Sequence, residues 1–303
     1  MTSSSNSVVK FRFIQGAKQI LLIYKVPTTQ ILLTKLITEN ASTMAVVVSP
    51  RLHSYVCCLL FIIISQASAQ PSFLNHFCLS DEGSFTANST YHTNLNTLLS
   101  NLTSNTQIDY GFYNLSYGEN SDKVYAIGVC RGDVKPDECR SCINNSTVLL
   151  TQLCQNQKEA IGWYDKCMLR YSNRSIFGLM ETSPLFYTLE FVNATNVDQF
   201  NQVLDNLVSN LTGIAAASGD SRHKYAAGNS TAPNLETIYG VVQCTPDLSQ
   251  QDCNQCLVEA FSRITSSGKI SGRVATPSCN IRYENYRFYD EPSTTTDAPA
   301  PSL

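Results

Sequence analysis

Charge and long apolar runs are both scarce in this sequence of 303 residues. Charged residues make up 15% of the chain and the formal net charge is −3, so the chain lacks the basic surface typical of nucleic-acid-binding proteins. A membrane-spanning helix needs about 20 apolar residues in a row, and the unbroken apolar run 56–64 has only nine. Apolar residues still make up 43% of the chain, which argues against a disordered protein and, at this length, suits two domains.

Motifs of common enzymes are also missing. The sequence contains no nucleophile elbow, P-loop or dinucleotide-binding fingerprint. The histidines after residue 69 (His76, His92 and His223) show no metal-binding spacing. The paired carboxylates at 137–138 fall at a predicted helix start, where acidic residues interact favourably with the helix dipole. We therefore expect no enzyme activity, no metal and no cofactor.

A secretory signal peptide is predicted at residues 44–69. Arg51 precedes the apolar run, and Ala67 and Ala69 follow it in an Ala-x-Ala cleavage signature. The mature chain then starts near Gln70 and is secreted to the extracellular space. We interpret residues 1–43 as an unstructured upstream extension, with a longer targeting leader as the alternative.

Ten of the 12 cysteines follow the signal peptide, in a compartment where disulfides are the rule. The same part of the chain carries nine N-glycosylation sequons, a number that fits a secreted glycoprotein. They lie at Asn88, Asn101, Asn114, Asn144, Asn145, Asn173, Asn193, Asn210 and Asn229.

A cysteine frame occurs twice. The pattern C-x8-C-x2-C starts at Cys130 and again at Cys244, 114 positions later (244 minus 130), and each copy is followed by one more cysteine, Cys167 or Cys279. A repeat of this length indicates two homologous domains. Each CxxC belongs to this larger frame, which favours structural disulfides over a redox dithiol or a zinc site.

The two copies constrain the disulfide pairing. Only the first has Cys78 and Cys154, and we expect these two to pair, because a bridge tends to be lost as a unit. Each frame has four cysteines, which could pair in three ways. If each CxxC lies on a helix, its two sulfurs are poorly placed to bond each other, and two of the three pairings remain. Of these we prefer Cys130–Cys139 with Cys142–Cys167, and Cys244–Cys253 with Cys256–Cys279.

Hydrophobic periodicity predicts the secondary structure of each copy. Helical spacing of apolar residues marks 91–102 and 200–211, and a second helix is expected to carry each CxxC. Aromatic and β-branched residues favour strands at 124–129, 162–171, 238–242 and 274–289. The predicted fold class is α+β, with two tandem small domains, each an antiparallel sheet packed on two helices and stapled by disulfides. The domains span 73–178 and 185–290, and the Pro/Thr-rich tail 291–303 is expected to be disordered.

The frame resembles the plant cysteine-rich repeat secretory proteins, which are built from ginkbilobin-homologous, stress-antifungal domains. The resemblance extends over about 73–289 and depends on the two frames and on the segments GWYDKCMLRY, QCTPDLSQQDC and CNIRYENYRFY. It implies a five-stranded antiparallel sheet with two helices in each domain, a disulfide pattern that agrees with the preferred pairing, and an apoplastic location. The tandem unit is also similar to the extracellular part of cysteine-rich receptor-like kinases and plasmodesmata-located proteins.

The resemblance also suggests a sugar site. One family member is a mannose-binding antifungal lectin that uses an Asn after its first cysteine, an Arg before its last cysteine and a Glu after it. The matching residues of the first domain are Leu79, Ile161 and Ser172, so the site looks absent there. In the second domain they are Arg273, Glu284 and, by equal spacing from Cys244, Asn193; alignment on Phe200 would shift the Asn.

An Arg, a carboxylate and an amide together offer donors and acceptors for vicinal hydroxyl groups. The alternative is a surface ion pair between Arg273 and Glu284, which would contribute little. A glycan on Asn193 would also block such a pocket.

Three functions remain open. The preferred one is a secreted extracellular binding protein of plant defence or stress response that recognises a carbohydrate or a cell-surface protein partner. The alternatives are a mannose-binding antifungal lectin that acts through the second domain, and an ectodomain fragment of a cysteine-rich receptor-like kinase. None of them involves nucleic acid, and none gives this sequence a membrane span.

Overall fold

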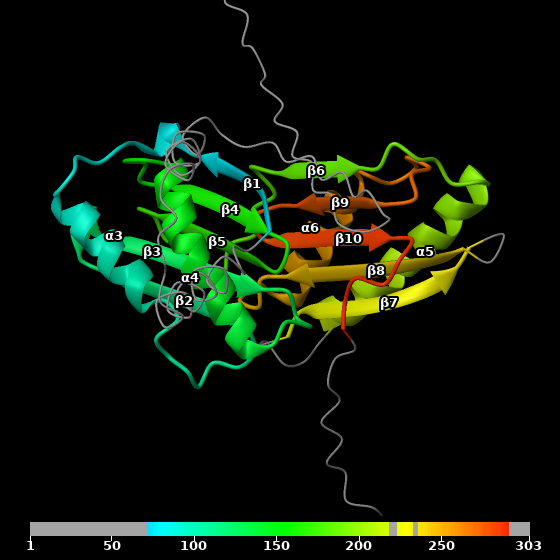
Figure 1. The fold of residues 1–303 in the computed structure, drawn as a ribbon, viewed down its shortest axis with the longest axis horizontal. Helices are drawn as coiled ribbons and strands as arrows, with labels where there is room; N and C mark the ends of the chain where they lie inside the picture. Colours follow the sequence, from blue (N-terminus) through cyan, green and yellow to red (C-terminus); the bar gives the residue numbers. More distant parts are fainter. Residues whose placement is uncertain (1–71, 218–222, 233–235, 291–303) are drawn as a thin grey trace, which may run out of the picture. The chain divides into compact units, whose positions relative to one another are not determined.

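The computed structural model describes residues 72–217, 223–232 and 236–290. The predicted extension 1–43, signal peptide 44–69 and tail 291–303 lie outside the described residues. The described chain forms two five-stranded antiparallel sheets, each with two α-helices (Figure 1). This is the predicted fold class.

The first sheet has the strand order β1-β4-β5-β3-β2. In chain order its strands are β1 (Phe73–Cys78), β2 (Phe112–Tyr117), β3 (Val124–Cys130), β4 (Ala160–Tyr164) and β5 (Cys167–Ser172). The second sheet has the matching order β6-β9-β10-β8-β7. Its strands are β6 (Phe186–Leu189), β7 (Tyr225–Thr231), β8 (Thr237–Cys244), β9 (Gly272–Ala275) and β10 (Cys279–Glu284).

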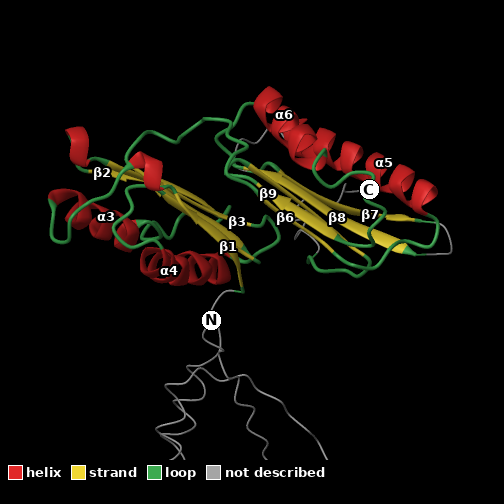
Figure 2. Ribbon diagram, turned by 90° about the horizontal axis from the view of Figure 1, so that it is seen from above, coloured by secondary structure: helices red, strands yellow, loops and turns green. Residues whose placement is uncertain are grey.

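Two helices cover one face of each sheet, as Figure 2 shows. They are α3 (Thr90–Asn101) and α4 (Pro136–Leu153) on the first sheet, and α5 (Val197–Ala217) and α6 (Gln250–Phe261) on the second. Local sequence fixes their starts: the hydroxyls of Ser89 and Ser249 cap α3 and α6, and Pro136 opens α4. The helix predictions at 91–102 and 200–211 and on both CxxC segments are confirmed.

Two strand predictions were wrong in extent. Segment 162–171 forms the hairpin β4–β5, which turns at Asp165 and Lys166, and 274–289 likewise contains the turn between β9 and β10. Aromatic and β-branched residues lie on both sides of each turn, so the sequence pattern predicted one long strand where the structure has two. The strands β1, β2, β6 and β7, which carry weaker patterns, were not predicted.

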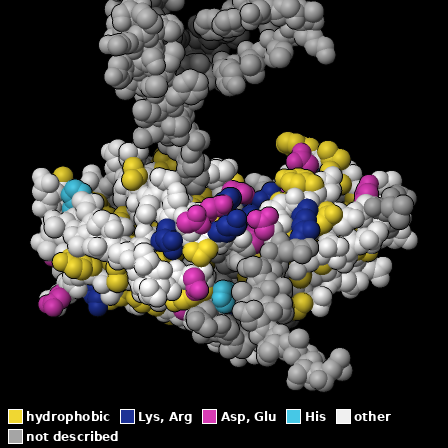
Figure 3. Space-filling model, turned by 60° about the horizontal axis from the view of Figure 1, so that its bottom comes forward, with side chains coloured by type: hydrophobic (Ala, Val, Ile, Leu, Met, Phe, Trp, Pro, Cys, Tyr) yellow, Lys and Arg dark blue, Asp and Glu magenta, His cyan; other side chains and the backbone are white. Residues whose placement is uncertain are grey.

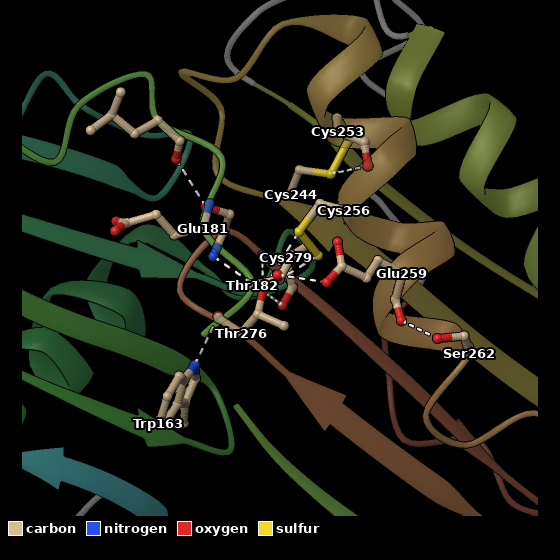
Figure 4. Close-up of a disulfide and its surroundings, with 12 residues drawn as sticks. Trp163, Glu181, Thr182, Cys244, Cys253, Cys256, Glu259, Ser262, Thr276 and Cys279 are labelled. Atoms are coloured by element: carbon tan, nitrogen blue, oxygen red, sulfur yellow. Dashed lines mark hydrogen bonds between the residues drawn. A yellow bond between two sulfur atoms is a disulfide. The ribbon is translucent and has the colours of Figure 1, made fainter. Parts of the chain in front are cut away.

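Five disulfides, three in the first domain and two in the second, connect helices to strands within each domain. The pairs are Cys78–Cys154, Cys130–Cys139, Cys142–Cys167, Cys244–Cys253 and Cys256–Cys279. Their Cα–Cα separations of 5.3 to 6.2 Å lie within the usual range for a disulfide. In each domain the CxxC helix is bonded to the strand that precedes it, β3 or β8, and to the strand that comes last along the chain, β5 or β10. Figure 4 shows these bonds in the second domain.

The face of the first sheet that lies opposite its helices is buried against the second domain. Trp163 and Ile161 of β4 belong to one apolar cluster with Phe186 and Ala275 of the second domain. The Trp163 indole Nε1 donates to the Thr276 carbonyl oxygen at 3.2 Å, across the junction (Figure 4). An apolar contact of this kind, with its buried polar group satisfied, makes the two domains one packed unit.

Candidate functional site

A turn of the first domain joins the two domains through one carboxylate. Asp165 lies between β4 and β5, and its Oδ1 accepts hydrogen bonds from Arg282 at 2.9 Å and from Arg273 at 3.2 Å. Arg131 lies 3.7 Å from Oδ2. Arg273 and Arg282 face each other on β9 and β10 and point away from the helices, because the alternate residues of β10 are buried in the helix-side core. Three guanidinium groups therefore surround one side chain.

Arg273 is the most deeply buried of these cations, with 8% of its surface exposed. Its guanidinium also donates to the carbonyl oxygens of Tyr164 and Asp165, at 3.5 and 3.4 Å. Burial, with repulsion from Arg282 and Arg131, lowers the pKa of Arg273 to about 10 despite the attraction of Asp165. The side chain stays charged at neutral pH, and its Nε is a buried donor without an acceptor among the described residues.

Further carboxylates balance the arginines. Asp133 accepts from Arg131 at 2.6 and 2.9 Å in a bidentate pair, and Glu284 accepts from Arg282 at 2.8 Å. Figure 3 shows basic and acidic side chains next to one another on the face in view. A site built this way has little net charge, which favours an uncharged polar ligand.

A cavity of about 300 Å³ opens beside these groups, at the junction of the domains. The first domain contributes Leu74 and Asp165, and the rest of the wall comes from β6, β9, β10 and residues directly next to these strands or shortly after β10. The second domain's lining residues are Thr188, Leu189, Glu190, Ser271, Gly272, Arg273, Arg282, Glu284 and Tyr286. This size is at the lower end of small-molecule sites.

The cavity wall offers the two kinds of contact that a sugar ring uses. Glu190, Glu284 and Arg282 are acceptors and donors for hydroxyl groups. The Tyr286 ring is 54% exposed, and its hydroxyl accepts from Arg282 at 3.2 Å, which fixes the ring beside the polar groups. An exposed aromatic ring next to fixed hydrogen-bonding groups can pack against the apolar face of a sugar.

Of the three residues predicted to bind sugar, the structure brings two together. Arg273 and Glu284 line this cavity, but Asn193 does not. The Asn193 Oδ1 accepts from the Lys269 ammonium at 2.7 Å instead.

The backbone shows which residue stands where the Asn was expected. Glu190 N bonds to Ser271 O just as Leu79 N bonds to Glu159 O, so Glu190 is the counterpart of Leu79. The interval from this position to the next frame cysteine is 51 residues in the first domain (130 minus 79) and 54 in the second (244 minus 190). Counting back an equal distance from Cys244 therefore misses the position by three residues.

The corresponding place in the first domain is closed. Ile161, the counterpart of Arg273, is fully buried in the apolar cluster between the domains. Ser172, the counterpart of Glu284, donates its hydroxyl to Glu159 at 2.7 Å. These contacts occupy the place in the first domain that corresponds to the wall of the cavity between the domains.

A buried ion network lies next to that closed place. Glu159, fully buried, accepts hydrogen bonds from Arg170 and Arg174, and both arginines also bond Glu181 in the segment that leads to the second domain. Burial alone would raise the pKa of Glu181, but hydrogen bonds and attraction from Arg170 and Arg174 outweigh it and lower this pKa. No local sequence pattern indicates this network, because its members are spread over residues 159–181.

The predicted glycosylation residues lie mostly at the surface. Eight of the nine sequon asparagines are exposed, and Asn173 is half-buried, with its Nδ2 donating to Glu82 O at 3.3 Å. Their glycosylation stays a prediction.

One cluster of metal-ligand type occurs in the described part of the chain, His76 with Cys78 and Cys154, but the two sulfurs are bonded to each other and so are not free to ligate a metal. No described helix has the length and apolar character needed to cross a bilayer.

Comparisons with known proteins agree with this architecture. The family model described as salt stress response/antifungal matches residues 77–174 and 188–286. Cysteine-rich receptor-like protein kinase 29 of Arabidopsis thaliana is 46% identical over 266 residues, which cover 83% of this chain and 39% of the kinase. The putative cysteine-rich receptor-like protein kinase 9 of the same plant is 39% identical, over 78% of this chain and 89% of that protein. The chain spans less than two fifths of the length of several of these relatives.

Two solved structures share the fold. The tandem DUF26 ectodomain of the Arabidopsis thaliana cysteine-rich receptor-like protein PDLP8 matches with a TM-score of 0.62 and 24% identity, over 71% of this chain and 98% of that one. The corresponding ectodomain of PDLP5 matches with a TM-score of 0.59 and 25% identity, over 70% and 98%. Both matches are to extracellular portions of receptor-like proteins.

Proposed function

Because this chain belongs to the salt stress response/antifungal family and carries the family's domain twice, we propose that it is an extracellular recognition module that binds a carbohydrate in the cavity between its domains. The observation that carries the proposal is the wall of that cavity, where Arg282, Glu284 and Glu190 surround the exposed ring of Tyr286. The five disulfides support an oxidising location outside the cytosol. This role, in plant defence or stress response, requires no catalytic step.

The near neutrality of the site favours a sugar over an ionic ligand. Asp133, Asp165 and Glu284 offset the three arginines, and Glu190 adds one exposed carboxylate. A fully anionic ligand would meet these acidic groups, and a cation would meet the guanidinium groups. Neutral hydroxyl groups can use both sets at once.

The experiment is a glycan array probed with the secreted protein after enzymatic removal of its N-glycans, followed by calorimetric titration of the best sugar. Glu284→Gln and Tyr286→Ala should each weaken binding at least tenfold, because they remove an acceptor and the stacking ring. Tyr187→Ala is the matched control, since Tyr187 is 56% exposed and lies outside the cavity lining. Absence of binding to every sugar on the array would exclude the carbohydrate function and direct the search to protein partners.

Arg273 is unsuitable as the test residue. Its guanidinium holds Asp165 and two carbonyl oxygens of the first domain, so its removal would also loosen the junction. A mannose-binding antifungal lectin is the narrower form of the same proposal. It requires mannose among the sugars bound and inhibition of fungal growth that Glu284→Gln abolishes.

A second candidate is the ectodomain of a cysteine-rich receptor-like kinase. The observation in its favour is the match to kinase 29, of which the chain covers 39%. Sequencing the transcript beyond codon 303 tests it. An apolar run of about 20 residues followed by a kinase domain would support this candidate, and a stop codon in its place would contradict it.

A further inference from the structure

A second cavity, of about 200 Å³, lies within the first domain and shares no residue with the cavity between the domains. It opens between the start of α3 and the segment after α4, beside the Cys78–Cys154 disulfide. Its base is formed by the buried side chains of Leu95 and Tyr171. This volume is on the scale of a single sugar ring.

An aromatic pair forms one wall. The rings of Phe85 and His92 are stacked, with centroids 5.3 Å apart and an interplanar angle of 22°. The His92 Nδ1 accepts a hydrogen bond from Asn88 N at 3.0 Å, so the neutral imidazole carries its hydrogen on Nε2, where it remains a donor. The wall thus combines apolar ring faces with one available N–H.

Three amide side chains surround the opening. Asn96, Gln155 and Asn156 are exposed and have no side-chain hydrogen bond to any described residue. Asn156 has a φ of 62°, and its carbonyl oxygen accepts from Phe85 N at 2.8 Å, which holds this segment against the aromatic wall. Each free amide offers both a donor and an acceptor.

None of the described residues that line this cavity is an Asp, Glu, Lys or Arg. An ionic ligand would therefore find no partner. The aromatic ring faces can pack against the apolar face of a ligand, and the free amides can bond hydroxyl or acetamido groups around its edge. We propose that this cavity binds one pyranose ring, a hexose or an N-acetylhexosamine.

Such a ring has two possible sources. One is a free saccharide. The other is the first sugar of a glycan on Asn88, whose backbone N–H bonds His92 in the cavity wall and which lies three residues after Phe85. Asn88 and Thr90 of the sequon are exposed. The chemistry that recognises the ring is the same for both sources.

The test uses saturation-transfer NMR with N-acetylglucosamine and mannose as probes, on the full secreted chain in a Tyr286→Ala background that weakens the other cavity. Deglycosylated protein should bind at least one probe with a Kd on the order of 1 mM, as expected for one ring. Gln155→Ala and Asn156→Gly should each reduce the apparent affinity several-fold. Gln152→Ala is the matched control, since Gln152 is an exposed α4 amide outside the cavity lining.

Glycosylated protein separates the two sources. If the Asn88 glycan fills the cavity, the glycosylated chain should not bind the free probe. Thr90→Ala removes this sequon alone and should restore binding. Thr195→Ala, which removes the Asn193 sequon, should not restore it. Equal binding before and after deglycosylation indicates a free saccharide. Absence of probe binding in the deglycosylated chain, or binding that Gln155→Ala and Asn156→Gly leave unchanged, would overturn the proposal without affecting the one for the cavity between the domains.

Discussion

Asp165 is the residue on which the polar half of the domain junction depends. Its carboxylate receives Arg273 and Arg282 directly and attracts Arg131, while its side chain remains about one-third exposed. Removal of its charge would leave Arg273 buried among cations without their shared counter-charge. An unpaired buried charge is among the few features for which one substitution has a large cost.

We predict that Asp165→Asn lowers the free energy of unfolding by about 1–3 kcal/mol, because charge-assisted hydrogen bonds become neutral ones and the arginines repel one another. Urea denaturation measures the change. The control Asp198→Asn, at an exposed residue of α5, should change stability by less than about 0.5 kcal/mol. Equal effects of the two substitutions would show that the junction does not depend on this carboxylate.

Glu181 gives the molecule a defined acid sensitivity. Its folded-state pKa is lower than the ordinary value of 4.5, because Arg170 and Arg174 more than offset burial. A carboxylate of this kind adds stability that is fully present above its unfolded pKa and is lost as the pH falls through the folded pKa. We predict that the wild type loses more unfolding free energy between pH 6 and pH 3 than Glu181→Gln does.

The measurement is chemical denaturation at several pH values, with Glu119→Gln as a control at an exposed carboxylate. The control should follow the wild type. A pH dependence unchanged by Glu181→Gln would contradict the assignment.

Site residues were predictable from the sequence only where their position could be counted from a nearby cysteine. Arg273 and Glu284 lie six before and five after Cys279, and both line the cavity. Glu190 was missed because the second domain has Leu189 where the first has Cys78, so no landmark marked the strand end. Asp165 was missed because its partners come from the other domain, 108 and 117 positions away, beyond the reach of any local pattern.

At the scale of elements, the helices were predictable and the strands only in part. Serine caps, Pro136 and a regular apolar stripe specify helices locally. The turn at Asp165 and Lys166 contains no Gly, Pro or Asn, and Asp165 is its one turn-favouring residue, which is a weak signal within a continuous aromatic and β-branched segment. The edge strand β7 (YAAGNST) is rich in small and polar residues, which carry little strand propensity.

The disulfides differ in how much chain they restrain. Cys78–Cys154 closes an interval of 76 positions and ties β1 to the residue that ends α4, whereas Cys130–Cys139 closes only 9. In the chain-entropy account the longer loop contributes about 4.5 kcal/mol and the shorter about 2.5 kcal/mol. The second domain has no counterpart of the longer bridge. Leu189 lies where the first domain has Cys78, and the segment 266–268, which corresponds to the region of Cys154, contains no cysteine.

We predict that the double change Cys78→Ala and Cys154→Ala destabilises the protein by about 4.5 kcal/mol, and that Cys130→Ala with Cys139→Ala costs about 2 kcal/mol less. Denaturation of both variants under identical oxidising conditions provides the comparison. A smaller cost for the longer bridge would show that native packing, rather than loop closure, dominates.

At the scale of the molecule, the two domains are coupled by one apolar cluster and one charged junction. The only tryptophan, Trp163, lies in that cluster and is 2% exposed, with its ring 5.2 Å from that of Phe186. Its fluorescence therefore reports the junction, and far-UV circular dichroism reports both sheets. The duplicated frame predicted two domains, but nothing local in the sequence indicated that the first sheet buries its open face against the second domain.

We predict that both signals change together during urea unfolding of the wild type, as a cooperative transition requires. Ala275→Asp places an unpaired carboxylate beside Trp163 and Phe186 at a cost of roughly 3–5 kcal/mol to the junction. In this variant the fluorescence transition should occur at lower urea than the dichroism transition. Coincident, unshifted transitions in the variant would contradict the coupling.

The central claim is that a carbohydrate binds between the domains and contacts both. Hydrogen–deuterium exchange with and without the best array sugar tests it most directly. We predict slower exchange of backbone amides in 188–190, 271–273 and 282–286 of the second domain, together with the 164–166 turn of the first. Slower exchange confined to other segments, or no change at a saturating sugar concentration, would contradict it.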